Sequence, residues 1–283
     1  MPEKPEFDPG AGVVSEFFQR GGAVARPISS AKGSQSIERA LNLIKEIHMC
    51  GKDGARTTDL VRRCQMEYPT THRILSVLVE QRVLRKDAGT RRYFLGQLIY
   101  ELGLSVEPRV DIRRHCDEMM RKLANEAEDT IFLSIRSGLD VVCIDRKEGA
   151  FPIKTFVFDV GSRRPLGIGA AGLALLMADP PEEVARILKA NRVHVTRYGK
   201  KLTVDELVAI VDYGRASGYI MVDDTAFPGV RAISIPFDLG PEAPRAAVSI
   251  AAVSARLPPR RVRDLVAVIR TEIDNLCPIG RLD

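Results

Sequence analysis

The segment Arg56–Gly96 constrains the fold most, because it combines two short helices, a tight turn and a basic hairpin. Apolar residues at helical spacing follow Thr57, and Pro69 suits the first turn of a second helix, where its missing N–H costs nothing. The stretch Arg85–Leu95 then has the pattern of strand, turn and strand, with the turn at Ala88–Thr90. This order predicts a winged helix-turn-helix, which places polar side chains in the major groove of double-stranded DNA.

The net charge of +5 is concentrated in the same part of the chain. Residues 34–100 contain 12 Lys/Arg and 7 Asp/Glu, whereas residues 1–33 and 101–283 each hold the two signs in equal number. Such a local excess is typical of a surface that binds phosphate. The side chains expected to contact DNA are Arg39, Thr57, Thr58, Tyr68, Thr70, Thr71, His72, Arg73, Arg91 and Arg92. For His72 and Arg73 the alternative is an ordinary polar helix surface.

A length of 283 residues and 45% hydrophobic residues favour two domains, each with its own core. The absence of Trp argues against base-stacking platforms for single strands. The five scattered cysteines indicate reduced, mostly buried thiols in a cytoplasmic protein. Neither a membrane-spanning apolar run nor a metal-ligand spacing is present, so we expect no membrane association, metal or cofactor.

Four segments are expected: a flexible arm at residues 1–33, the winged helix-turn-helix at 34–97, a linker helix at 98–110, and an effector-binding and oligomerisation domain at 111–283. The first helix, capped by Ser34 or Ser36, is expected to bury Ile37, Ala40, Leu41, Leu43, Ile44 and Ile47. A later helix, from Pro108 to about Glu128, carries the stripe Ile112, Cys116, Met119, Met120, Leu123 and Ala127. We interpret this stripe as core or, with the first helix, as part of a dimer interface.

Beyond residue 129 the pattern alternates between strands and helices. Strands are expected at 130–136, 141–145, 154–160, 219–222, 232–237 and 245–253, and helices at 170–178, 181–191, 204–217 and 259–276. This mixed order predicts an α+β fold, in which one antiparallel sheet is backed by helices and can enclose a small molecule.

Three patterns could indicate chemistry, and each has a simpler explanation. Gly167–Gly172 satisfies G-x-G-x-x-G, but no parallel β-α-β unit surrounds it, so close helix packing is the better interpretation. His115 and Cys116 are adjacent on a helix and point about a hundred degrees apart, so they cannot pair as base and nucleophile. Asp223 and Asp224 are more typical of a turn at a strand end than of acid/base catalysis. We therefore expect no enzymatic activity.

Several ordered motifs resemble the IclR family of bacterial transcription regulators. They are Ser36–Ala40, Thr71–Leu75, Arg92–Gly96, Gly161–Leu166, Ala171–Leu176, Gly218–Tyr219, Pro228–Ile233 and Ala247–Ile250. The resemblance covers about residues 34–278. It implies a winged helix-turn-helix, a linker helix and a GAF-like α/β domain that binds a small, often acidic metabolite. It also implies a dimer or a dimer of dimers acting on inverted-repeat operators.

The resemblance also implies an effector site, carried over by position to Gly169, Ala170, Ala171, Asp223, Asp224, Ala232 and Ser249. Backbone N–H groups at a helix start and the Ser249 hydroxyl would hold a carboxylate. Gly167 and Leu173 stand where the family commonly has His and Lys, which suggests a less polar pocket and an aromatic or longer-chain acid. The alternative is that these small residues only allow close packing of helix on sheet.

The sequence thus predicts a ligand-responsive transcriptional regulator, a repressor of a catabolic operon that a small carboxylate releases or remodels. An activator of such an operon is the alternative, because the sequence does not fix the sign of regulation. An enzyme tethered to DNA would need a catalytic set that we do not find. A DNA-architecture protein would bind DNA regardless of any small molecule.

Overall fold

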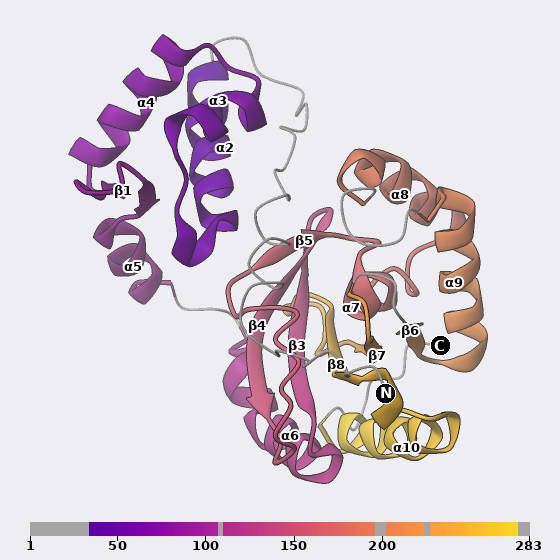
Figure 1. Cartoon of the computed structure of the whole chain (residues 1–283). Coiled ribbons are helices and arrows are strands. Elements are labelled where there is room, and N and C mark those ends of the chain that lie inside the picture. Colours follow the sequence, from indigo (N-terminus) through magenta and orange to yellow (C-terminus); the bar gives the residue numbers. More distant parts are fainter. Residues whose placement is uncertain (1–33, 107–109, 196–201, 224–226, 277–283) are drawn as a thin grey trace, which may run out of the picture. The chain divides into compact units, whose positions relative to one another are not determined.

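The computed structural model describes residues 34–106, 110–195, 202–223 and 227–276. The chain divides into two compact units, and the division falls between Gly103 and Leu104 (Figure 1). Each unit is described by itself. Within the described ranges, no helix is both long enough and apolar enough to cross a membrane.

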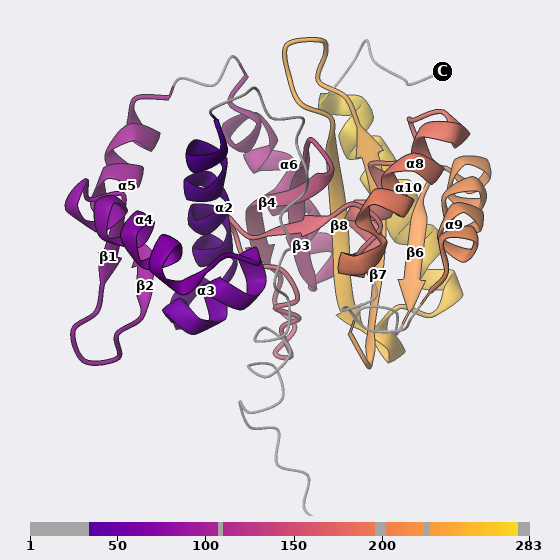
Figure 2. The same ribbon diagram turned by 90° about the horizontal axis from the view of Figure 1, so that it is seen from above.

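The N-terminal unit has the helix-turn-helix and hairpin that the sequence predicts. Its elements are α2 (Gln35–Met49), η1 (Gly51–Asp53), α3 (Thr57–Cys64), α4 (Tyr68–Glu80), β1 (Leu84–Lys86), β2 (Tyr93–Leu95) and α5 (Gln97–Leu104). The turn between α3 and α4 begins at Gln65, whose φ of 52° is left-handed and ends α3. Figure 2 shows the loop between β1 and β2 extending beyond the helices, as a wing does.

The core of this unit uses only one of the two apolar stripes on α2. Leu43 and Ile47 are buried, together with Leu60, Leu75 and Tyr93 from the other elements. Ile37 and Leu41 were expected in the core, but they are 65% and 50% exposed. Ile37 and Leu41 lie one turn apart on a second apolar stripe of α2. The few short helices of this unit do not cover that stripe.

The C-terminal unit is an α/β domain built on one sheet. It contains α6 (Ile112–Ala127), β3 (Thr130–Ser137), β4 (Asp140–Glu148), β5 (Arg163–Pro165), α7 (Gly169–Ala174), α8 (Pro181–Val195), α9 (Val204–Ser217), β6 (Ile220–Asp223), β7 (Val230–Phe237), β8 (Ala246–Val253), η2 (Ser254–Arg256) and α10 (Pro259–Leu276). The sheet is antiparallel, in the order β5-β4-β3-β8-β7-β6.

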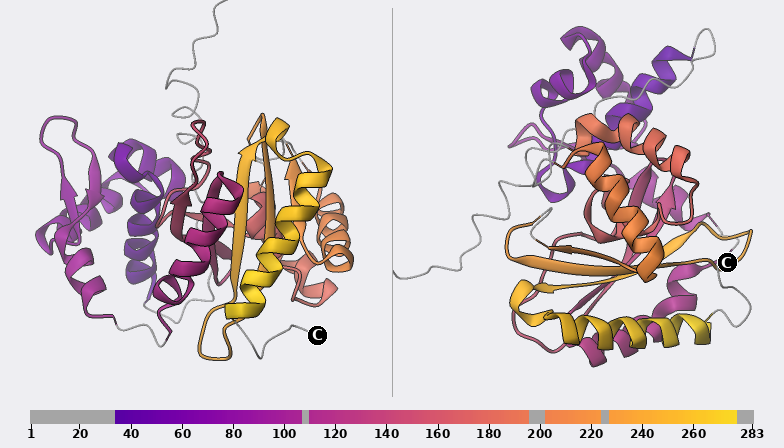
Figure 3. Two further views of the ribbon diagram at one scale, coloured as in Figure 1. Left: turned by 90° about the horizontal axis from the view of Figure 1, so that it is seen from below. Right: turned by 90° about the vertical axis from the view of Figure 1, so that its right-hand side faces the viewer.

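Helices cover both faces of this sheet (Figure 3). α6 and α10 pack on one face, where Met120, Leu133 and Ile269 are fully buried. α7, α8 and α9 lie on the opposite face, where Leu173 and Leu188 are fully buried. The two faces therefore have separate cores, and the second one contains the cavity described below.

The apolar stripe of α6 is core and not an interface. Its six residues are between 0% and 4% exposed within the chain itself. The stripe packs on the sheet and on α10, so the expectation that it contributes to a dimer contact is wrong.

Two element boundaries also differ from the prediction. Residues 154–160 form no strand; they run as a loop, and the strand follows later at Arg163–Pro165. Val157 and Phe158 are adjacent and both line the cavity, whereas Phe156 is 44% exposed, so the side chains do not alternate as they do in a strand. No neighbouring strand pairs with this loop.

α6 begins at Ile112 with Asp111 as its N-cap, not at Pro108. Residues 107–109 of the predicted linker lie outside the described part.

Candidate DNA-contact face and effector cavity

The N-terminal half of α4 presents polar side chains to solvent. His72 and Arg73 are exposed, and Tyr68 is 51% exposed. The Tyr68 and His72 rings lie one helical turn apart and stack with their centroids 6.2 Å apart. These three residues form one surface that can enter a major groove.

Thr71 does not belong to that surface. Its side chain is fully buried, and its hydroxyl donates a hydrogen bond to the Glu67 carbonyl oxygen at 3.0 Å. It precedes the buried Leu75 by one turn, so it shares the core-facing side of α4. Its assignment to DNA contact is therefore corrected.

The other predicted contacts lie on three elements. Thr58 is exposed and Thr57 half-buried at the start of α3, Thr70 is half-buried on α4, and Arg39 is half-buried on α2. Their contact with DNA stays a prediction.

The two arginines at the end of the wing differ in their surroundings. Arg91 is exposed, with a φ of 55°. Arg92 folds back, and its Nη1 donates to the carbonyl oxygens of Asp53 and Gly54 at 3.1 and 3.0 Å. These bonds hold the wing against the segment before α3 and give Arg92 a structural role, and its contact with DNA stays a prediction.

The wing has two further exposed cations that the sequence-based set omitted. The Arg85 guanidinium lies 4.2 Å from the Phe94 ring centroid, and the Lys86 ammonium lies 5.3 Å from that of Tyr93. Cation–π contacts hold both side chains along the hairpin. Their signal in the sequence was a basic pair opposite an aromatic pair across the hairpin, with Arg85 facing Phe94 and Lys86 facing Tyr93.

Hydrogen bonds shape the wing loop itself. Thr90 donates from its backbone N–H and from its hydroxyl to Asp87 Oδ1, at 2.7 and 2.6 Å. These bonds stabilise the ionised carboxylate and hold the pKa of Asp87 below its usual value. The loop is thus ordered by its own side chains.

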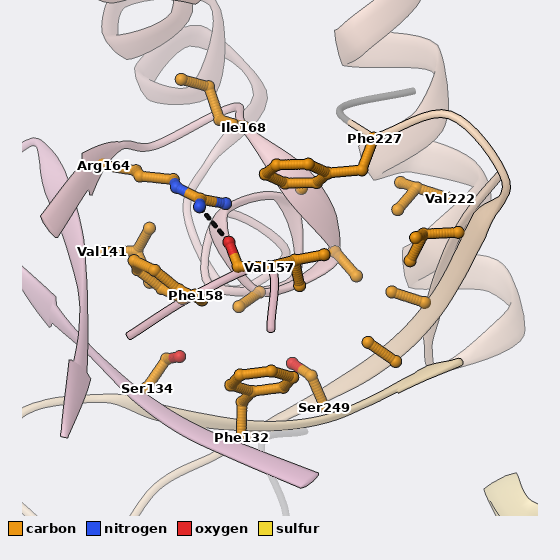
Figure 4. Close-up of a pocket in the computed structure, with 16 residues that line it drawn as sticks. Phe132, Ser134, Val141, Val157, Phe158, Arg164, Ile168, Val222, Phe227 and Ser249 are labelled. Carbon is orange, nitrogen blue, oxygen red and sulfur yellow. Dashed lines mark hydrogen bonds between the residues drawn. The ribbon is translucent and has the colours of Figure 1, made fainter. Parts of the chain in front are cut away.

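The C-terminal unit contains a cavity between the sheet and the segments that lead into α7 and β7. It has a volume of about 580 Å³, including the solvent at its mouth. Its lining residues are mostly apolar, and 16 of them are drawn in Figure 4. Apolar walls with a few converging polar groups are typical of sites that bind small organic molecules.

Five of the seven predicted effector residues line this cavity. They are Gly169, Ala170, Ala171, Ala232 and Ser249. These small residues therefore leave space beside the sheet, and Ala170 and Ala171 also pack in the helix–sheet core. α7 is a helix of six residues, and Ala170 and Ala171 form part of the wall.

The predicted acidic pair does not contribute in the expected way. The Asp223 carboxylate accepts hydrogen bonds from the Arg231 guanidinium and, at 2.7 Å, from the Ser254 hydroxyl. It joins the ends of β6, β7 and η2 and does not line the cavity. Asp224 lies outside the described residues.

Gly167 and Leu173, the two departures from the family pattern, do not line the cavity either. Leu173 is fully buried in the helix–sheet core. Gly167 has a φ of 101°, and a Cβ there would lie 2.6 Å from the Leu188 side chain on α8. The loss of His and Lys at these positions therefore does not set the polarity of the cavity, contrary to the sequence-based argument.

The polar group that sequence reasoning missed is Arg164 on β5. This side chain lines the cavity and is only 7% exposed. Its guanidinium lies 4.5 Å from the Phe158 ring centroid and 4.9 Å from that of Phe227, and it donates to the Val157 carbonyl oxygen. The available signal was a basic residue directly before the buried Pro165–Leu166.

Two hydroxyl groups complete the polar lining. Ser249 donates to Ser234 Oγ at 2.8 Å across the β7–β8 ladder, and Ser234 donates to the Val248 carbonyl oxygen at 3.2 Å. Ser134 on β3 is fully buried, and its hydroxyl has no hydrogen-bond partner among the described residues. Within those residues, no cluster of His, Cys, Asp and Glu could hold a metal ion.

A winged helix-turn-helix joined to a helix-covered sheet with a cavity defines a DNA-binding regulator with a sensor domain. Two family models match the chain: the IclR helix-turn-helix domain over residues 36–88, and the C-terminal domain of bacterial IclR transcriptional regulators over residues 105–277. The chain belongs to the IclR family. It is a transcriptional regulator and not an enzyme.

Relatives with known names agree with this assignment. The HTH-type transcriptional regulator BhcR of Paracoccus denitrificans is 27% identical over 248 residues, covering 86% of each chain. The HTH-type transcriptional repressor AllR of Klebsiella pneumoniae is 25% identical over 267 residues, covering 93% of this chain and 96% of AllR. An IclR-family regulator from Brucella abortus has the same fold, with a TM-score of 0.71, 19% identity and coverage of 89% and 98%.

Proposed function

We propose that this regulator represses a catabolic operon, and that a small carboxylate metabolite bound in the cavity releases or remodels its complex with DNA. The observation that carries the proposal is the buried Arg164 guanidinium in a cavity with mostly apolar walls. A guanidinium in such surroundings can pair with the carboxylate of a ligand through charge-assisted hydrogen bonds.

DNA recognition is attributed to α4 and the wing. His72 and Arg73 would reach base edges, and Arg91 would reach phosphate. One helix-turn-helix reads few base pairs, so two copies on an inverted repeat are proposed, as a dimer or a dimer of dimers. The protein would act in the cytoplasm, where bacterial DNA is found.

The sign of regulation is proposed from a relative. AllR of Klebsiella pneumoniae is described as a repressor and aligns over nearly the whole chain, which supports repression here. Activation of the same kind of operon is the second candidate, since the same geometry of DNA and ligand binding serves both.

Both candidates can be tested with DNA from upstream of the chain's own gene and of its neighbours. We expect a gel shift at nanomolar protein, and a change in that shift when pathway metabolites are added. In a reporter strain, deletion of the gene should raise transcription of the neighbouring operon. Lower transcription on deletion would indicate an activator, and a shift unaffected by every metabolite would contradict ligand control.

A further inference from the structure

The polar groups of the cavity lie on two opposite sides. In Figure 4, Arg164 and Phe227 lie on one side, and Ser134 and Ser249 lie on the other, on the sheet. The side chains between them are apolar, and several are aromatic. A ligand that satisfies both sides must therefore have two polar ends joined by an apolar body.

The Arg164 end suits a carboxylate. A guanidinium presents planar, paired N–H donors that match the two oxygens of a carboxylate. The side chain is held in place by the Phe158 and Phe227 rings and by the Val157 carbonyl oxygen. Among the described residues that line the cavity, none is Asp or Glu.

The serine end suits a hydroxyl that donates. Because the Ser234 proton is used on the Val248 carbonyl oxygen, the bond between Ser249 and Ser234 requires the Ser249 proton. Ser249 therefore offers only lone pairs to the cavity. A carboxylate there would meet no donor from Ser249, whereas a ligand hydroxyl could donate to it.

Ser134 is the second group at this end. Its hydroxyl is fully buried, lines the cavity and has no partner among the described residues. Buried hydroxyl groups in native proteins are nearly always paired, so an unpaired one on a cavity wall indicates a ligand atom. Ser134 can donate to the same ligand oxygen that donates to Ser249.

Aromatic rings define the space between the ends. Phe132 lies on the sheet side, and Phe158 and Phe227 lie toward Arg164 (Figure 4). Rings on opposing walls favour a flat body, because aromatic groups pack well face to edge or in offset stacks.

From these observations we infer that the cavity selects a hydroxylated aromatic monocarboxylate, with Arg164 binding the carboxylate and Ser134 and Ser249 binding the ring hydroxyl. The inference rests on the proposed function, in which this cavity is the effector site. Arg164 and Ser134 are thus the residues that set effector specificity, and neither was expected from sequence.

Calorimetry with three matched probes tests this assignment. The probes are 4-hydroxyphenylacetate, phenylacetate, which lacks the hydroxyl, and 4-hydroxyphenylacetamide, which lacks the charge. With the unmodified protein, we expect loss of the hydroxyl to weaken binding about 3- to 10-fold. Loss of the charge should weaken binding about 10- to 100-fold, because the hydrogen bonds to Arg164 are charge-assisted.

Variants show whether these differences depend on the named side chains. In Ser134→Ala the hydroxylated and unhydroxylated acids should bind within about 2-fold of one another, and in Arg164→Gln the acid and the amide should do so. Ser217→Ala and Arg163→Gln make the same changes outside the cavity and should preserve the differences. Arg164→Lys keeps a charge without the planar fork and should bind the acid with intermediate affinity.

Stability measurements distinguish the loss of a ligand contact from the loss of folding in these variants. Ser134→Ala removes a hydroxyl without a described partner, so its thermal midpoint should stay equal or rise. Unchanged probe differences in the folded variants would overturn the assignment of Ser134 or Arg164. If no probe binds while operator DNA still binds and responds to another metabolite, the ligand class is wrong and the proposed function stands. If operator DNA itself is not bound, the proposed function fails.

Discussion

Asp129 at the start of β3 accepts a hydrogen bond of 2.9 Å from Arg256, which lies 127 positions later in the chain. Arg261 on α10 donates to the other carboxylate oxygen at 3.0 Å. The Asp129 side chain is only 1% exposed, and the Arg256 guanidinium also lies 3.5 Å from the Phe151 ring centroid. This buried cluster joins the beginning and the end of the C-terminal unit.

Asp129→Asn should therefore destabilise the C-terminal unit by about 3 kcal/mol, because the buried carboxylate that both arginines share would lose its charge, and Arg256 would keep only Glu128 at 3.7 Å. Urea unfolding followed by circular dichroism would measure the change. Asp212→Asn breaks an exposed pair with Arg215 and should cost less than about 1 kcal/mol. Equal effects of the two changes would show that burial does not strengthen the Asp129 cluster.

Arg73→Ala should weaken binding to the operator by about 1–3 kcal/mol and relax the base preference at one position of each half-site. The reason is that Arg73 is exposed on the helix assigned to the major groove. Gel-shift titrations with operator variants would measure both effects. Thr71→Val serves as the comparison at a buried position of the same helix, and Arg73→Ala with unchanged affinity and preference would remove α4 from DNA reading.

Arg91 and Arg92 should respond differently to truncation. Arg91→Ala should reduce the slope of log affinity against log salt by about 1, as expected for one lost phosphate contact. Arg92→Ala removes the two bonds to the carbonyl oxygens of Asp53 and Gly54, and it should destabilise the N-terminal unit by about 1 kcal/mol. Thermal melts and salt titrations on both variants separate the roles, and identical profiles would refute the distinction.

Ala171→Phe should abolish the effect of the metabolite on DNA binding and leave operator affinity near normal. Ala171 is 9% exposed and lines the cavity, so a phenyl ring would occupy ligand space. Calorimetry with the effector and gel shifts with the operator would measure the two properties. Ala190→Phe, at an exposed position on α8, is the matched control, and unchanged effector affinity in Ala171→Phe would place the ligand elsewhere.

Native cysteines in both units should resist alkylation. Burial raises the pKa of Cys64 and of Cys143 to about 12. Since the thiolate is the reactive form and fewer than about one thiol in a thousand is ionised at pH 8, the reaction should be slow. Iodoacetamide labelling read by peptide mass spectrometry should leave both residues unmodified until guanidinium unfolds the chain. Rapid native labelling of either one would indicate local opening.

Strong periodicity made much of the fold predictable. α9 and α10 have the predicted bounds, Val204–Ser217 and Pro259–Leu276. α4 likewise followed from Pro69 near its start and the stripe through Leu75. These elements are governed by local signals, which a single sequence contains.

The cavity was only partly predictable, because its polar groups depend on tertiary contacts. Ala171 and Ser249 were found through the positions of family motifs. The places of Arg164 and Ser134 in the cavity wall depend on rings and strands that are distant in sequence. No spacing rule identifies a buried hydroxyl without a partner. The same limit explains Ile37, whose exposure depends on which stripe of α2 the neighbouring helices cover.

The strand order β5-β4-β3-β8-β7-β6 has a consequence for synthesis on the ribosome. β3 pairs with β8, so this central ladder cannot form until Ala251, the partner of Thr130 about 120 residues later, has been synthesised. At about 5–20 residues per second, that delay lasts roughly 6–24 s. The helix-turn-helix needs only nearby partners. The N-terminal unit can therefore fold several seconds before the C-terminal unit completes its sheet and its cavity.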